Sequence, residues 1–153
     1  MTPRIANALK LIPAGYKAMS AVEASIRESG LEKKLLYLVK MRASRINHCA
    51  FCIHMHATEA RAIGETEMRL YMLNAWRECP LYSERERAAL AWTEAVTLVA
   101  QTHVPDAVHD EARAQFSEEE LVKLTLLVAI INAWNRIAIS FRSVHPVEAA
   151  RAA

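Results

Sequence analysis

Residues that interrupt regular structure are scarce in this chain. Only three glycines and five prolines occur among 153 residues, whereas 53% of the residues are hydrophobic. Disordered and loop-rich proteins have the opposite composition, with low hydrophobicity and abundant Pro and Gly. A chain of this length can bury about two-thirds of its unfolded surface. We therefore predict one compact domain over residues 1–153.

A surplus of one charge and a long apolar run are also missing. The 19 Lys and Arg residues are scattered among 17 Asp and Glu residues, and no basic stripe with interleaved aromatics appears, so we expect no nucleic-acid partner. The longest apolar run, Leu124 to Trp134, contains two polar residues and is far shorter than the roughly 20 residues that span a bilayer. The first residues lead into an amphipathic segment rather than a signal core. We expect a cytoplasmic protein without a membrane partner.

Helical periodicity runs through nearly the whole chain, and no segment alternates as a strand does. Two capping boxes, Ser83–Glu86 and Ser117–Glu120, predict the starts of two long helices, and Gly64 is typical of a helix end. Pro13 to Gly15 reads as a break between helices. The fold class is thus an all-α bundle of seven or eight helices, with approximate bounds 3–11, 16–29, 31–46, 48–63, 65–76, 83–100, 105–115 and 117–141.

The last long helix is apolar over most of its circumference, which predicts burial on several sides. It should supply much of the core together with the helix that begins near residue 83. For so short a chain, a second subunit is one way to cover such a helix, and we expect a homo-oligomer. The tail, 144–153, is expected to be peripheral and without a chemical role.

The only concentration of reactive side chains is the run that contains Cys49, Cys52 and His56. Residues three and four apart on a helix share a face, with β-carbons roughly 5–6 Å apart, and a disulfide needs about 3.8 Å. A modest distortion of the first turn would close that gap. Asn47 is a candidate N-cap, which would place Cys49 in the first turn, where the helix dipole favours a thiolate. We predict a redox-active dithiol assisted by the histidine.

Two other interpretations of these residues remain open. Both cysteines could be small buried hydrophobic residues and His56 a core histidine, or Cys49, Cys52 and His56 could bind zinc, although a second ligand pair is missing. We expect neither a metal nor another cofactor. The third cysteine, Cys79, precedes Pro80 in a loop and is expected to be incidental.

The dithiol segment and its flanks closely resemble the alkylhydroperoxidase-like (AhpD-like) branch of the carboxymuconolactone decarboxylase family. The resemblance extends from about residue 15 to residue 142 and is densest over 31–63. It rests on Leu31-Glu32-Lys33-Lys34-Leu35, Lys40-Met41-Arg42-Ala43-Ser44-Arg45-Ile46-Asn47-His48-Cys49-Ala50-Phe51-Cys52-Ile53-His54-Met55-His56, Gly64-Glu65-Thr66-Glu67, Glu84-Arg85-Glu86-Arg87-Ala88-Ala89-Leu90-Ala91-Trp92-Thr93-Glu94-Ala95 and Ile131-Asn132-Ala133-Trp134-Asn135-Arg136.

This resemblance implies an AhpD-like helical fold, trimers or hexamers, and thiol-dependent reduction of alkyl hydroperoxide or hydrogen peroxide. It implies that Cys52 attacks the peroxide, that Cys49 resolves the sulfenic acid, and that His56 activates the thiolate. A reducing dithiol protein or a small-molecule thiol would then reset the disulfide. The helix-dipole reasoning favours Cys49 as the attacking thiol instead, but an imidazole one turn from Cys52 is the better proton acceptor, so we assign attack to Cys52.

One departure from the family pattern concerns the proton relay. The family places a glutamate twelve residues before the first cysteine, and here that position is Tyr37, which can pass a proton but supplies no resting carboxylate. Tyr37 is retained as a catalytic candidate, and Glu86, Glu94 or a neighbouring subunit are the candidates for the missing carboxylate. Aromatic residues that could line a pocket near the thiols are Trp76, Trp92, Trp134 and Phe51.

Two further functions compete with peroxide reduction. A non-catalytic redox sensor or scaffold would form the disulfide without multiple turnover. A lactone decarboxylase, the chemistry that names the wider family, would have no need for a disulfide-forming pair.

Overall fold

The computed structural model describes residues 2–144, and in this range the chain forms eight α-helices, two short 3-10 helices and no strand. The predicted all-α fold is confirmed, and the predicted tail lies outside the described residues apart from Val144. The elements are η1 (Ala8–Leu11), α1 (Pro13–Arg27), α2 (Lys33–Ile46), α3 (Ala50–Ala62), α4 (Glu67–Met72), η2 (Leu73–Ala75), α5 (Glu84–Thr97), α6 (Val99–Thr102), α7 (Asp106–Gln115) and α8 (Glu118–Phe141).

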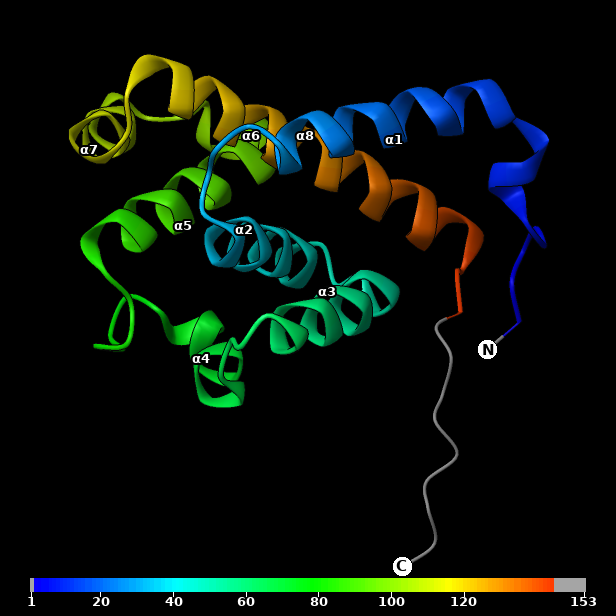
Figure 1. Cartoon of the computed structure of the whole chain (residues 1–153), viewed down its shortest axis with the longest axis horizontal. Helices are drawn as coiled ribbons and strands as arrows, with labels where there is room; N and C mark the ends of the chain where they lie inside the picture. The colour runs from blue at the N-terminus through cyan, green and yellow to red at the C-terminus, as the bar shows by residue number, and fades with distance from the viewer. Residues whose placement is uncertain (1, 145–153) are drawn as a thin grey trace, which may run out of the picture.

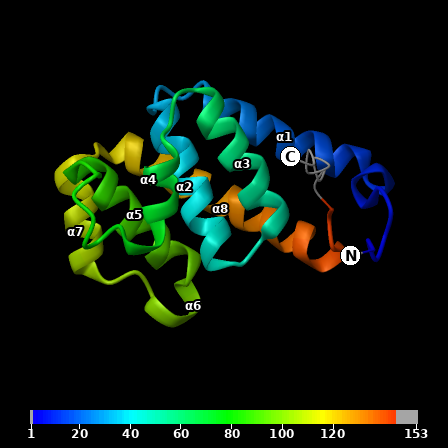
Figure 2. The same cartoon turned by 90° about the horizontal axis from the view of Figure 1, so that it is seen from below.

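Helix α2 lies at the centre of the bundle and packs against α3, α5 and α8 (Figures 1 and 2). Helix α1 runs alongside α8, and the N-terminal segment meets the end of α8 (Figure 1). The backbone N–H of Arg4 donates to the carbonyl of Phe141 at 2.9 Å, and its guanidinium donates to the carbonyl of Ser140 at 3.1 Å. The two ends of the described chain are therefore held together by hydrogen bonds at one end of the bundle.

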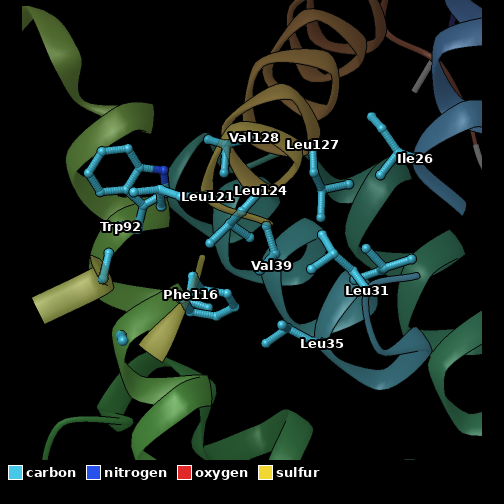
Figure 3. Close-up of a cluster of buried hydrophobic side chains, with 14 of the residues drawn as sticks. Ile26, Leu31, Leu35, Val39, Trp92, Phe116, Leu121, Leu124, Leu127 and Val128 are labelled. Atoms are coloured by element: carbon cyan, nitrogen blue, oxygen red, sulfur yellow. The ribbon is translucent and has the colours of Figure 1, made fainter. Parts of the chain in front are cut away.

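The largest apolar cluster lies where α1, α2, α5 and α8 meet (Figure 3). Leu124 and Leu127 from α8 and Val39 from α2 are fully buried there. Burial of such side chains stabilises the fold by about 1.5–3 kcal/mol each. This cluster fixes α2 and α8 relative to each other, and these are two of the helices that surround the dithiol.

The two predicted capping boxes are confirmed, but several helix boundaries differ from prediction. The helix expected over 3–11 is only a 3-10 turn, η1, and the one expected over 65–76 is split between α4 and η2. The side chains of Ser83 and Ser117 each accept from the backbone three residues on, and the glutamate there returns the bond. Pro13 begins α1 instead of interrupting the chain, because proline at the first helical position sacrifices only an N–H that has no partner within the helix. The helix expected to reach residue 100 ends at Thr97, and a separate turn, α6, follows.

Among the described residues, α8 alone has the length and apolar composition that a membrane crossing would require. Core helices of globular proteins share that composition, and the buried seam of α8 packs against α1, α2 and α5 in this fold. The side of α8 opposite this seam carries exposed apolar residues, among them Val122 and Leu126.

Candidate functional site: a dithiol, a histidine and a cavity

The two cysteines lie at the start of α3, where Cys49 is itself the N-cap. The Cys49 sulfur accepts a hydrogen bond from the backbone N–H of Cys52 at 3.4 Å. The prediction that Asn47 caps this helix is wrong: Asn47 ends α2, and its side chain donates to α8. The corner between α2 and α3 turns through His48, at a φ of 55°. The sulfur therefore takes the place that a capping oxygen would have.

A hydrogen bond between the thiols sets the order in which they ionise. The bond from the Cys52 thiol, helped by the backbone N–H groups of Cys52 and Phe51, outweighs the effect of burial and lowers the pKa of Cys49 to about 7. The same bond and burial raise the pKa of Cys52. The pair thus loses one proton near neutral pH and shares the other, so the first ionisation belongs to both sulfurs.

A cavity of about 900 Å³ opens beside the dithiol, between the N-terminal segment, α1, α2, α3 and the end of α8. Cys52 lines this cavity although only 2% of its surface is exposed, whereas Cys49 is 1% exposed and is not part of the wall. Of the two sulfurs, that of Cys52 is therefore the one that a molecule in the cavity can approach. His56, one helical turn further along α3, lines the same cavity.

His56 is held by a carboxylate on its own helix. Its Nδ1 lies 2.8 Å from a carboxylate oxygen of Glu59, and the exposed fractions of the two side chains are 5% and 43%. The hydrogen bond with His56 lowers the pKa of Glu59, and Lys40 and Arg27 lower it further. Among the described residues, the buried Nε2 of His56 has no hydrogen-bond partner.

The structure also places Tyr37 at this cavity, without a direct link to the sulfurs. Its ring lies 6.4 Å from the His56 ring, centroid to centroid, at an interplanar angle of 49°. Burial, and then the charge of Glu59, raises the pKa of the Tyr37 phenol. Within residues 2–144 the Tyr37 hydroxyl makes no hydrogen bond to Cys49, Cys52 or His56.

The two glutamates suggested as relay carboxylates lie elsewhere, which makes that suggestion wrong for this chain's own fold. Glu86 closes the capping box of α5 and pairs with Arg69 at 2.5 Å. Glu94 pairs with Arg42 and Arg77 and accepts from the indole of Trp76 at 2.6 Å. Both carboxylates already have strong partners and neither lines the cavity.

Beside the dithiol, α8 contributes a buried amide. Asn135, fully buried, forms a hydrogen bond with the Cys52 side chain that lowers the pKa of this thiol, against the larger opposing effects of Cys49 and burial. Asn135 also donates to the hydroxyl of Ser44 at 3.1 Å and accepts from Asn47 at 2.9 Å. With its oxygen held by Asn47, the amide is oriented so that its N–H groups face Ser44 and Cys52.

Of the four aromatic residues expected near the thiols, two lie there. Trp134 and Phe51 line the cavity, and Tyr16 packs edge-on against Trp134 at 5.9 Å. Trp76 and Trp92 belong to the cores instead. The proposed zinc site gains no support, since residues 2–144 contain no group of three or more His, Cys, Asp or Glu side chains that could hold a metal ion.

The family model for carboxymuconolactone decarboxylases matches residues 13–95. The uncharacterised protein YdfG of Bacillus subtilis is 43% identical over 131 residues, which is 86% of this chain and 89% of the relative. The chain belongs to the carboxymuconolactone decarboxylase family.

Comparison with solved structures indicates the AhpD-like branch of the family. A protein of unknown function from Agrobacterium tumefaciens, provisionally described as the antioxidant defence protein AhpD, is 48% identical with a TM-score of 0.92, over 96% of this chain and all of that one. A peroxidase-related protein from Silicibacter has a TM-score of 0.78 and covers 93% of this chain and 75% of its own, but at 22% identity it shows the fold alone.

Sequence reasoning missed two residues of this family member's site. Glu59 had a readable signal, because a glutamate three residues after a histidine on a helix can reach its ring. Asn135 lies in one of the segments that carry the family resemblance, but no sequence pattern indicated its contact with the dithiol, because that contact depends on how α8 crosses α3.

Proposed function

We propose that this protein is a thiol-dependent peroxidase that cycles its dithiol between the reduced pair and a Cys49–Cys52 disulfide. One observation carries the proposal: Cys52 shares a hydrogen bond with a second thiol and lines a cavity that also contains His56. An attacking thiolate, a resolving thiol and a proton acceptor are the groups that two-cysteine peroxide reduction needs.

In the first step, one proton leaves the dithiol for Nε2 of His56. The remaining proton moves along the hydrogen bond to Cys49, and the charge comes to Cys52. The Cys52 sulfur attacks the terminal peroxide oxygen, the O–O bond breaks, and the alkoxide takes the proton from His56. Cys52 becomes a sulfenic acid, ROOH becomes ROH, and His56 is neutral again.

In the second step, the Cys49 sulfur attacks the sulfenic sulfur and water leaves. The net reaction converts the dithiol and ROOH into a disulfide, ROH and water. A dithiol protein or a small-molecule thiol then reduces the disulfide by exchange. The volume and the aromatic and aliphatic walls of the cavity favour an organic hydroperoxide over hydrogen peroxide.

The test follows thiols and mass in the reduced protein after one equivalent of cumene hydroperoxide. We expect two thiols per chain to disappear with a loss of two hydrogens in mass. Cys49→Ser should stop at a sulfenic acid that a dimedone probe captures, and Cys52→Ser should not react with peroxide at these sites. Unchanged peroxide turnover in Cys52→Ser would exclude this mechanism, and a disulfide without turnover under any thiol reductant would favour the sensor.

We also propose that the chain forms a homo-oligomer through the exposed side of α8. Val122 and Leu126, with 69% and 44% of their surfaces exposed, are one turn apart, and the exposed Ala129 continues the stripe. Light scattering should give a mass that is a multiple of the 17.2 kDa chain, and Leu126→Lys should lower it. A monomeric wild-type protein at micromolar concentration would contradict this.

A further inference from the structure

Peroxide reduction through His56 requires that one particular ring nitrogen carry the lone pair. The imidazole has two nitrogens, and only Nε2 is left unpaired by the residues that the structure describes. We propose that Glu59 is the positioning residue that holds His56 in the tautomer with its proton on Nδ1, in place of a carboxylate at the position of Tyr37. This inference rests on the proposed peroxidase function and adds a residue to it.

The contact between Glu59 and His56 follows from the helix itself. Residues at i and i+3 lie on the same face, and here they bring a carboxylate oxygen to 2.8 Å from Nδ1. The histidine side chain is 5% exposed, so its ring is packed in place, whereas the glutamate reaches it from the cavity side with 43% of its surface exposed. The pair therefore needs no other helix or subunit to form.

The charge of Glu59 decides which nitrogen is protonated. An ionised carboxylate can only accept hydrogen bonds, so the nitrogen facing it must donate. Nδ1 thus carries the proton in the neutral ring, and Nε2 keeps its lone pair. A carboxylate that fixes a histidine in this way also stabilises the imidazolium once the second nitrogen takes a proton.

Other charged and titratable groups around this pair do not compete for Nδ1. Lys40 of α2 is engaged by Glu23 of α1 at 2.6 Å. Arg27 of α1 and Lys40 lower the pKa of Glu59, which keeps it ionised. Lys10, Tyr16, Tyr37 and Cys52 are the other titratable residues that line the cavity among the described residues.

Because Nε2 is free to accept a proton, Glu59 itself neither gains nor loses a proton during the reaction. Nε2 accepts one proton from the dithiol and gives the same proton to the departing alkoxide. Nδ1 keeps its own proton and donates its hydrogen bond to Glu59 throughout. Glu59 therefore changes neither charge nor bonding during the cycle. Glu59 instead raises the fraction of His56 rings whose Nε2 can accept a proton from the dithiol.

The direct test reads the tautomer of His56 by long-range proton–nitrogen NMR correlation in the reduced wild-type protein near neutral pH. We expect the neutral ring to be protonated on Nδ1, and in Glu59→Gln this tautomer should lose its dominance. Neutral His56 protonated mainly on Nε2 in the wild type would overturn the proposal, whatever the activity.

The kinetic arm compares single-turnover oxidation by cumene hydroperoxide in Glu59→Gln, Glu59→Asp and Glu119→Gln. Glu119 is a control of the same charge change, 78% exposed on α8 and outside the cavity. We expect a loss of about tenfold or more for Glu59→Gln, which is part of the roughly 10²–10⁴ that positioned acid–base catalysis contributes. Glu59→Asp should recover part of the rate, and Glu119→Gln should match the wild type.

The two proposals can fail separately. If Cys52→Ser abolishes peroxide oxidation but Glu59→Gln keeps the wild-type rate and tautomer, the peroxidase function stands and the role of Glu59 is rejected. If Cys52→Ser leaves the reaction intact, the function itself fails, whereas the NMR result still reports on the Glu59–His56 pair.

Discussion

The side-chain amide of Asn47 donates to the side-chain carbonyl of Asn135 at 2.9 Å, which joins the end of α2 to α8 next to the dithiol. The same amide also donates to Asn132 at 2.8 Å, and Asn132 in turn donates to Thr97 of α5 at 3.1 Å. This network links α2, α5 and α8 through the half-buried amide of Asn47 and the buried amides of Asn132 and Asn135. A network of this kind fixes a unique geometry only while every member is satisfied.

We expect Asn135→Ala to lower the free energy of unfolding by about 1–3 kcal/mol, the usual cost of leaving buried polar groups without partners. Asn47 and Ser44 would both lose a partner, and the hydrogen bond to Cys52 would be lost as well. Urea unfolding measures the first effect. The rate of peroxide oxidation measures the second and should fall.

The control for this variant is Asn74→Ala, because Asn74 is exposed and, among the described residues, its side chain accepts from Arg42 alone. Exposed substitutions of this kind usually change stability by less than about 0.5 kcal/mol. Equal losses for the two variants would show that the buried network contributes nothing particular.

The first ionisation of the dithiol is expected at about pH 7, because the hydrogen bond from Cys52 lowers the pKa of Cys49. The ultraviolet absorbance of the thiolate, titrated in a Cys79→Ala background, reports it directly. For an acid with a lowered pKa, the charged form is present above that value and lost as the pH falls through it. Replacing the donor in Cys52→Ala should move the midpoint up toward about 8.5, the ordinary thiol value. An unmoved midpoint would assign the effect to the helix start alone.

Arg69 holds two carboxylates near the start of α5. It lies 2.9 Å from Glu65, whose side chain is 2% exposed, and 2.5 Å from Glu86. We expect Arg69→Met to destabilise the fold by about 3–5 kcal/mol, because the buried Glu65 would lose the guanidinium that pairs with it. Denaturant unfolding measures this, and adding Glu65→Gln should recover part of the loss.

The matched variant for Arg69→Met is Arg61→Met. Arg61 pairs with Glu67 at 3.0 Å, but both side chains are more than half exposed. Exposed pairs contribute about 0–1 kcal/mol. If Arg61→Met cost as much as Arg69→Met, burial of the ion pair could not be the cause.

The sequence predicted helices well where local signals agree with the fold, as at the capping boxes of Ser83 and Ser117. It failed where a local signal had a competing partner. Asn47 is a residue type favoured at N-caps, but its side chain donates hydrogen bonds to α8 instead. The sulfur of Cys49 therefore caps α3. No local pattern in one sequence reports a partner some 85 residues away.

The site follows the same division. The grouping of Cys49, Cys52 and His56 depends on helical spacing and was predictable. The cavity and the contact of Asn135 with Cys52 depend on tertiary packing and were not. The family pattern of a glutamate twelve residues before the first cysteine pointed to the position of Tyr37. The carboxylate in contact with His56 comes instead from the helix of His56 itself.

Tyr37→Phe separates these two views of the relay. The Tyr37 hydroxyl makes no hydrogen bond to the sulfurs or to His56 within residues 2–144, and burial raises its pKa, so it stays protonated at neutral pH. We therefore expect Tyr37→Phe to keep the single-turnover rate within about twofold of the wild type, whereas Glu59→Gln loses much more. Stopped-flow oxidation of both variants at one peroxide concentration makes the comparison. Phenylalanine keeps the ring that packs against His56 and removes only the hydroxyl. A large loss of rate in Tyr37→Phe with an unchanged His56 tautomer would therefore assign the proton relay to the Tyr37 hydroxyl.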